Sequence, residues 1–315
     1  METSTTSKSR YEKHDRPSWP FVVWHAIRPR TLPLSFSPVL AGSAVGWVET
    51  GVLRLDITIV AVLVIAIIQI GTNLQNDAID TLNETDQPDR AGPVRVTERG
   101  WLTPGQVIRA AYFAYAVGLF LGAYLVYQGG LPILILGMLS VAAAYAYSGG
   151  PWPVSRGPLG EVFVIAFFGL VAVGGVAYLY GAPFDLKTIL MGLAIGVPAA
   201  AVLLVNNLRD LESDKRAGRL TLAILLGREG AIWLYGAFLF LVTAGLIAIA
   251  TSGGPWVGAM LGLSGIPLGV RIWRTLSSAE DAQTFNTCLS RTAIFQLLVT
   301  ITMCLGLGLA VMVGG

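Results

Sequence analysis

Long stretches that lack any charged residue constrain this chain more than any other feature of its sequence. A bilayer core about 30 Å thick is crossed by about 20 apolar residues of α-helix. Five of the stretches fit one crossing each, and the two longest fit two each, because turn signals interrupt them at 129–132 and 252–255. The sequence therefore predicts an all-α, polytopic membrane protein with nine transmembrane helices. The seven stretches are 31–48, 57–76, 110–155, 162–184, 188–208, 230–270 and 292–315.

Composition and the chemistry of the bilayer exclude other classes of protein. Charged residues make up 13% of the 315, against about 25% in soluble domains, and the net charge is only +2. Unpaired backbone groups are too costly in lipid for open strands, and the apolar stretches do not alternate as barrel strands do. We therefore expect the lipid bilayer as a partner and no nucleic acid. Nothing in the sequence fixes the oligomeric state.

The chain divides into a short N-terminal part and one large domain. Residues 1–27 form a polar tail and an interfacial segment, where aromatic and apolar residues at 19–24 predict a short helix at the membrane surface. Residues 28–315 form the nine-helix domain. With a cytoplasmic N-terminus, 19 of the 21 Lys and Arg residues lie inside, which leaves Arg54 and Lys187 outside. This bias predicts the orientation.

Two acidic patches begin at the predicted cytoplasmic ends of the second and sixth helices. At 100° per residue, Asp77 and Asp80 share one helix face, as do Asp210 and Asp214, whereas Glu212 points away. Two facing helices would therefore present four carboxylates to one pocket. The first patch contains Asn73, Asn76, Asp77, Asp80, Glu84, Asp86, Asp89 and Arg90, and the second contains Asn206, Asn207, Arg209, Asp210, Glu212, Asp214, Lys215 and Arg216.

Carboxylates that lie this close repel one another, and burial increases the cost. A divalent cation is the simplest compensation, and oxygen ligands suit Mg²⁺, which commonly bridges carboxylates to substrate phosphates. The alternative is that both patches are solvated charges that end helices and set topology. The pattern favours a Mg²⁺-bound polyphosphate that carries a lipid tail. Four basic residues would meet the remaining phosphate charge: Arg90, Arg95, Lys215 and Arg219.

Both patches resemble known motifs. Asn76-Asp77-x-x-Asp80 and Asp210-x-x-x-Asp214 are similar to the two Asp-rich motifs of the UbiA superfamily of intramembrane aromatic prenyltransferases, whose members have nine helices. Where the wider superfamily has a third Asp, four residues after Asp80, this chain has Glu84; Asp86 follows, and either could reach the metal. Further stretches resemble the branch that prenylates 1,4-dihydroxy-2-naphthoate in menaquinone synthesis: 28–34, 85–93, 147–151, 159–161, 206–214 and 218–223.

The resemblance implies an activity and a location. A polyprenyl group would pass from an allylic diphosphate to 1,4-dihydroxy-2-naphthoate with loss of CO₂ and diphosphate, giving demethylmenaquinone in the bacterial cytoplasmic (inner) membrane. Arg30 would meet the naphthoate carboxylate or simply set topology. The catalytic residues would be Asp77, Asp80, Asp210 and Asp214; Mg²⁺ would be held by these and Asp86; substrates would be bound by Asn73, Asn76, Arg30, Arg90, Arg95, Asn207, Lys215 and Arg219.

Three alternatives stay open at this point. The same chemistry could serve another acceptor, namely 4-hydroxybenzoate, homogentisate, haem or a glycerol phosphate. The naphthoate acceptor could instead receive a phytyl group. A protein of another class, a cation- or proton-coupled membrane transporter, could also use clustered carboxylates, although transporter sites tend to lie at mid-membrane in interrupted helices.

Overall fold

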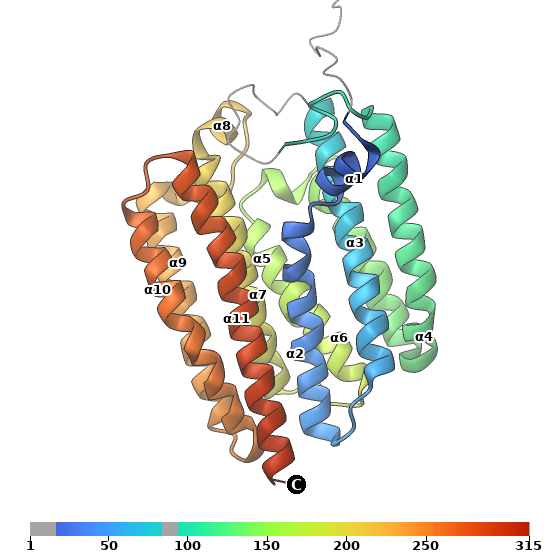
Figure 1. The fold of residues 1–315 in the computed structure, drawn as a ribbon, viewed down its shortest axis with the longest axis vertical. Coiled ribbons are helices and arrows are strands. Elements are labelled where there is room, and N and C mark those ends of the chain that lie inside the picture. The colour runs from blue at the N-terminus through green and yellow to red at the C-terminus, as the bar shows by residue number, and fades with distance from the viewer. Residues whose placement is uncertain (1–16, 84–93, 315) are drawn as a thin grey trace, which may run out of the picture.

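The computed structural model describes residues 17–83 and 94–314, and every regular element in these two ranges is helical. The helices run side by side in one bundle (Figure 1). In chain order the elements are α1 (Trp19–Ile27), η1 (Pro29–Thr31), α2 (Leu32–Thr50), α3 (Leu55–Leu82), α4 (Pro104–Ser148), η2 (Val154–Arg156), α5 (Gly160–Val164), η3 (Ile165–Val171), α6 (Ala172–Leu179), α7 (Leu186–Arg209), α8 (Leu211–Arg216), α9 (Leu222–Ala250), η4 (Gly254–Gly265), α10 (Ile266–Ser277) and α11 (Ala282–Gly314).

The prediction of a polytopic all-α membrane protein is confirmed. The described residues contain seven helices that are long and apolar enough to cross a membrane, or eight if the bent pair α1 and α2 counts as one span. The predicted break at 252–255 is also present, because α9 ends at Ala250 and η4 begins at Gly254. Length and composition alone do not reproduce the predicted nine, since α4 counts as one helix of 45 residues.

The chain reverses direction within α4. Gly130 has a non-helical backbone with φ of 68°, which a glycine adopts without steric cost. Gln75 lies beside both arms, since its side chain accepts from the Tyr115 hydroxyl at 3.3 Å and donates to the Tyr145 carbonyl at 2.7 Å. A straight helix would hold residues 115 and 145 about 45 Å apart. The two antiparallel arms favour the predicted third and fourth crossings, so the count of nine stays a prediction with this support.

One crossing is built from three consecutive elements, α5, η3 and α6. The middle element, η3, is π-helical, a form that is often found at functional sites. It packs closely on α7, because a Cβ atom added to Gly169 would lie 2.6 Å from the backbone oxygen of Gly192. Gly169 thus allows the two helices to approach closely. Helix α7 lies at the centre of the bundle. In its most apolar segment 78% of the residues are buried, against 11% to 39% in the other candidate spans.

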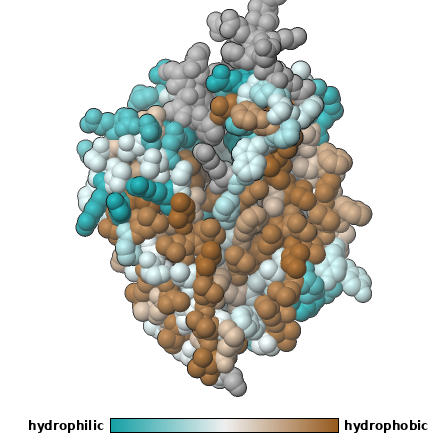
Figure 2. Space-filling model, in the orientation of Figure 1, coloured by the Kyte–Doolittle hydropathy of each residue, from teal (hydrophilic) through white to brown (hydrophobic). Residues whose placement is uncertain are grey.

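The surface separates a hydrophobic middle from two polar ends. Figure 2 shows hydrophobic residues over much of the height of the bundle and a concentration of hydrophilic ones at its upper end. The ion pairs of Arg54 with Asp56 and of Lys187 with Glu49 lie at the starts of α3 and α7. The acidic patches lie at the other ends of these same two helices. The two basic residues predicted to be outside are therefore separated by the length of the bundle from both patches.

Candidate active site

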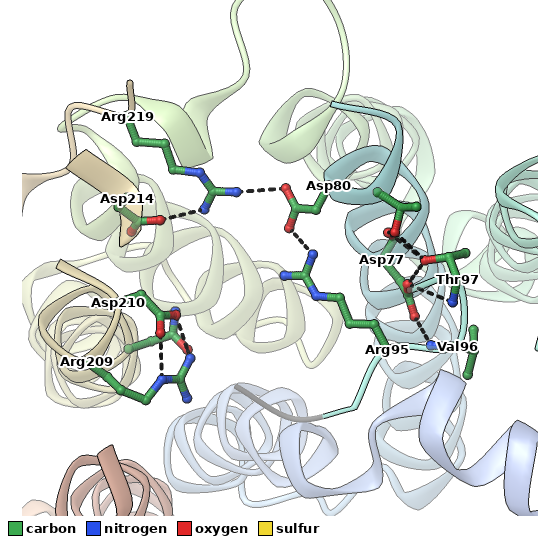
Figure 3. Close-up of polar contacts among 11 residues, drawn as sticks. Asp77, Asp80, Arg95, Val96, Thr97, Arg209, Asp210, Asp214 and Arg219 are labelled. Carbon is green, nitrogen blue, oxygen red and sulfur yellow. Dashed lines mark hydrogen bonds and ion pairs between the residues drawn. The ribbon is translucent and has the colours of Figure 1, made fainter. Parts of the chain in front are cut away.

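The two acidic patches meet at one end of the bundle. A single guanidinium joins them, because Arg219 contacts the Asp80 carboxylate at 2.8 Å and the Asp214 carboxylate at 3.3 Å (Figure 3). Asp80 lies near the end of α3, Asp214 lies in α8, and Arg219 follows α8 in the loop that leads to α9. Asp80 and Asp214, which belong to different helices far apart in the chain, are thus separated only by the Arg219 side chain. The expected convergence of the two patches is what the structure shows.

Asp80 is paired with a second arginine. Arg95 contacts the other oxygen of the Asp80 carboxylate at 2.6 Å, and only 7% of the Arg95 side chain is exposed. Arg95 comes from the loop between α3 and α4, whereas Arg219 comes from the loop after α8. Two loops therefore deliver positive charge to one carboxylate. Hydrogen-bonded, charge-assisted contacts of this kind are the strong ones in proteins.

Asp77 holds the loop that carries Arg95. Its carboxylate is buried, with 1% of the residue exposed, and it accepts a hydrogen bond of 3.0 Å from the Val96 amide. Its other oxygen accepts from the amide of Thr97 at 3.4 Å and from the hydroxyl of the same residue. Three donors of the loop, two amides and one hydroxyl, thus engage the Asp77 carboxylate. The geometry gives Asp77 the task of fixing the loop beside Asp80.

Asp210 is held by its own neighbour in the chain. The guanidinium of Arg209 donates to both Asp210 oxygens, at 2.8 and 2.6 Å. The same group donates to the side-chain oxygens of Asn206 and of Asn286 in α11, each at 2.9 Å. Arg209 therefore orients Asp210 and ties the ends of α7 and α11 together. Arg209 belongs to the second acidic patch, but no role was predicted for it, although its place between two Asn and an Asp was the available signal.

Burial makes the ionised form of Asp214 less stable. Burial raises the pKa of the Asp214 carboxyl to about 6. Arg219 lowers this pKa, and the nearby carboxylates of Asp210 and Asp80 raise it. A raised pKa means that the negative charge of the carboxylate is incompletely compensated. A cation bound beside Asp214 would supply the missing compensation. The surroundings of Asp214 therefore favour a site to which a cation binds together with an anionic ligand.

Other predicted residues lie at different depths. Asn73 donates to the Ile27 carbonyl at 3.2 Å and to the Thr31 hydroxyl at 2.9 Å, which anchors the chain before α2 to α3. Asn76 lies one turn further along α3 and lines the main cavity, and its buried side-chain oxygen accepts no hydrogen bond from a described residue. Asn76 thus brings to the cavity an amide oxygen that no described residue engages.

Two predicted substrate ligands point elsewhere. Asn207 donates to Glu161 at 2.9 Å in a buried contact between α7 and α5, and it does not line the main cavity. Lys215 pairs at 3.2 Å with Glu212, whose side chain is 75% exposed, so this pair lies on the surface. The prediction that Glu212 points away is confirmed. Glu84, Asp86, Arg90 and the side chain of Arg30 lie outside the described residues.

A cavity of about 700 Å³ begins beneath the joined patches. It is lined along α3 from Asn76 to Ala61, a helix length of about 22 Å. Asn76 lies one helical turn before Asp80, and Asn206, which also lines the cavity, lies one turn before Asp210. Its polar lining is thus next to the carboxylates, and the rest is largely apolar. Polar residues of the lining include Arg28, Thr31, Gln69, Thr72, Asn73, Asn76, Tyr147 and Asn206.

The carboxylates suit Mg²⁺ that arrives with a phosphate ligand. In the described ranges, no three acidic, His or Cys side chains come together closely enough to hold an ion by themselves. Mg²⁺ does not need such a group, since it keeps several waters and usually takes one or two carboxylates together with substrate phosphates. Asp80, Asp210 and Asp214 offer oxygen donors, and Arg95 and Arg219 are the kind of side chain that pairs with phosphate.

The fold and the joined Asp motifs define an intramembrane enzyme, and comparison with known proteins gives its family. Residues 35–296 match the UbiA prenyltransferase family, so the chain belongs to that family. It is therefore an enzyme of the prenyltransferase class, which argues against the transporter alternative.

Individual relatives agree with the family. The 1,4-dihydroxy-2-naphthoate octaprenyltransferase of Mycobacterium tuberculosis is 35% identical, over 80% of this chain and 85% of its own length. The protein of the same name from Escherichia coli is 33% identical, over 90% of this chain and 94% of its own length. A solved UbiA homologue from Archaeoglobus fulgidus, bound to DMAPP and Mg²⁺, shares the fold, with a TM-score of 0.62 at 14% identity over 89% of this chain and 99% of its own.

Proposed function

We propose that this protein transfers a polyprenyl group from an allylic diphosphate to 1,4-dihydroxy-2-naphthoate, giving demethylmenaquinol (the reduced form of demethylmenaquinone), CO₂ and diphosphate. The observation that carries the proposal is the Arg219 bridge between Asp80 and Asp214, at the polar end of an apolar cavity. The names of the bacterial relatives support the naphthoate acceptor. The enzyme works in the bacterial cytoplasmic membrane, with the joined patches on the cytoplasmic side.

The polar end of the cavity binds the diphosphate. Asp80, Asp210 and Asp214 hold Mg²⁺, which, when bound, neutralises the charge that the leaving diphosphate gains. Arg95 and Arg219 exchange part of their pairing with carboxylates for pairing with phosphate oxygens. Asp77 acts as a positioning residue, because its carboxylate fixes the loop that carries Arg95. Preorganised charge of this kind is worth most where charge develops in the transition state.

The apolar part of the cavity holds the prenyl chain and excludes water. In the reaction, the allylic C–O bond breaks, the electron pair leaves with the diphosphate, and a ring carbon of the naphthoate forms the new C–C bond. When the attacked carbon is the one that bears the carboxylate, loss of CO₂ returns its bonding electron pair to the ring and restores aromaticity without a proton transfer. A dry lining protects the allylic cation from capture by water, and Phe163, Phe167 and Phe168 contribute aromatic faces to that lining. Asn76 offers its unpartnered oxygen to a substrate or a metal-bound water.

An acceptor panel tests the proposal. Purified full-length protein receives Mg²⁺, a polyprenyl diphosphate, and dihydroxynaphthoate labelled in its carboxylate. Labelled CO₂ should appear in step with prenylated quinol, because decarboxylation accompanies transfer. Parallel reactions use 4-hydroxybenzoate, homogentisate, haem or a glycerol phosphate as acceptor, and a phytyl donor with the naphthoate. Faster turnover with another acceptor would contradict the assignment, and faster turnover with phytyl diphosphate would change the donor.

Removal of the metal is expected to stop the reaction. With excess EDTA, product formation should fall to the background rate, because no cation would then neutralise the charge of the leaving diphosphate. Added Mg²⁺ should restore the original rate, because it is a hard cation that prefers oxygen ligands. Ca²⁺ tests whether the size of the ion affects the rate, since Ca²⁺ prefers more ligands at longer distances. Full turnover in EDTA would contradict the metal's role.

A further inference from the structure

A second groove lies on the opposite side of the bundle from α4, where α9, η4 and α10 meet (Figure 1). Its volume is about 690 Å³. Its floor is apolar and two arginines of α10 stand at its edge, so that it combines surface for a hydrocarbon chain with fixed positive charge. The lining residues are Thr243, Leu263, Ile266, Pro267, Val270, Arg271 and Arg274.

The charged edge of the groove lies toward the cytoplasmic end. Arg228, near the start of α9, donates to the backbone oxygen of Ala279, just after α10. Helix α9 follows the loop that carries Arg219, so the C-terminal part of α10 lies at the same end of the bundle as the active site. Arg271 and Arg274 belong to that part. Figure 2 shows hydrophilic residues on the upper part of this edge of the molecule, above a more hydrophobic lower part.

Aromatic residues mark the depth of the groove in the membrane. The ring of Trp273 lies 5.7 Å from that of Trp233 in an edge-on arrangement, and its indole N–H donates to the Ile232 carbonyl at 2.8 Å. Trp233 is 69% exposed on the outside of α9. Tryptophan is enriched at the level of lipid headgroups. Trp273 lies between Arg271 and Arg274 in the sequence, so both arginines are close to that level.

Arg271 and Arg274 carry uncompensated charge. They are three residues apart on one helix, so their side chains lie on the same face. Both are exposed, and neither forms an ion pair with an acidic side chain of the described residues. Exposed arginines beside a lipid-facing groove attract anionic lipid headgroups, and basic pockets between transmembrane helices on the cytoplasmic side are typical sites for them.

We propose that this groove binds an anionic phospholipid. Its phosphate and headgroup pair with Arg271 and Arg274, and an acyl chain lies along Leu263, Ile266 and Val270. The site is separate from the catalytic cavity, with which it shares no lining residue. The proposal therefore does not depend on the identity of the acceptor.

Native mass spectrometry of the full-length protein in detergent tests the site, with equal amounts of phosphatidylglycerol and phosphatidylcholine. The wild type should retain phosphatidylglycerol preferentially. R271Q/R274Q should reduce that preference about 30-fold, because each basic residue near a lipid headgroup contributes about fivefold. R271K/R274K should keep most of it. R109Q, which removes an exposed arginine from α4 on the other side of the bundle, should leave it unchanged.

Either of two results would overturn the proposal. One is an unchanged preference in R271Q/R274Q, which would place anionic lipid elsewhere or nowhere. The other is a shift in oligomeric state in R271Q/R274Q without a change in lipid retention, which would make the groove a contact between copies of this chain. Prenyl transfer measured in parallel reports on the catalytic proposal separately, because failure there leaves the lipid result interpretable.

Discussion

Asparagine in place of Asp80 or Asp214 is expected to lower turnover by about 10²–10³-fold, the usual cost of removing one preorganised electrostatic group from a transition state. Each replacement keeps the shape of the side chain and removes the charge that would hold Mg²⁺. Steady-state assays with purified protein measure the effect. The loss should appear in kcat/KM, because the same charges help to bind the Mg²⁺–diphosphate and to compensate it as it departs.

Glu212→Gln is the matched control for these two variants. Glu212 belongs to the same helix as Asp214 and carries the same kind of charge, but its side chain is 75% exposed and pairs only with Lys215. Its replacement should leave turnover within about twofold of wild type, because surface ion pairs contribute little. Equal losses of turnover in Glu212→Gln and Asp214→Asn would show that the total negative charge of α8, rather than the position of Asp214 in the site, controls the rate.

Alanine in place of Asp77 is expected to lower both turnover and stability. The change leaves the amides of Val96 and Thr97 buried without their acceptor, which costs about 1–3 kcal/mol for each unsatisfied group. The loop would then no longer hold Arg95 against Asp80. We expect a turnover loss of at least about tenfold, together with a lower unfolding temperature in a thermal shift assay.

The comparison with Asp80→Asn separates the two roles. Asp80→Asn leaves the hydrogen bonds of Asp77 to the loop in place, so its variant should lower the unfolding temperature less than Asp77→Ala does. A metal-ligand role for Asp77 predicts the reverse pattern, with a large loss of turnover and no loss of stability. That result would return Asp77 to the metal site.

Much of the fold could be predicted because the bilayer imposes it. In lipid a helix satisfies its own backbone polar groups by hydrogen bonds, so the uncharged stretches indicated the crossings. The basic residues predicted a side for each loop. The convergence of two patches followed in turn, since Asp80 and Asp214 fall on the same predicted side. The interruption of the long uncharged stretch near Gly130 could also be predicted from the sequence, but the packing of the two arms against α3 could not.

The pairing of the charges could not be predicted from spacing. Helical periodicity placed Asp77 and Asp80 on one face, but the loop at Val96 and Thr97 takes up the first carboxylate and leaves the second to Arg95 and Arg219. Such contacts depend on how a loop folds back over a helix end, and no local pattern encodes that.

The same limit applies to Asn207 and Lys215. Asn207 was placed in the site because helical spacing puts it on one face with Asp210 and Asp214, and Lys215 because it follows Asp214 in the sequence. One step along a helix is a rotation of about 100°, and this rotation turns Lys215 to the surface. Asn207 is turned instead toward Glu161, a partner 46 residues earlier in the chain.

The central claim is that aspartates from both motifs hold one Mg²⁺–diphosphate. Equilibrium binding of an unreactive thiolo analogue of a prenyl diphosphate, measured with and without Mg²⁺, tests it most directly. We predict that Mg²⁺ tightens binding to the wild type and that Asp80→Asn and Asp214→Asn each remove this Mg²⁺-dependent gain, although they lie on different helices. A variant of either residue that keeps the full gain would show that the two motifs do not share the ligand.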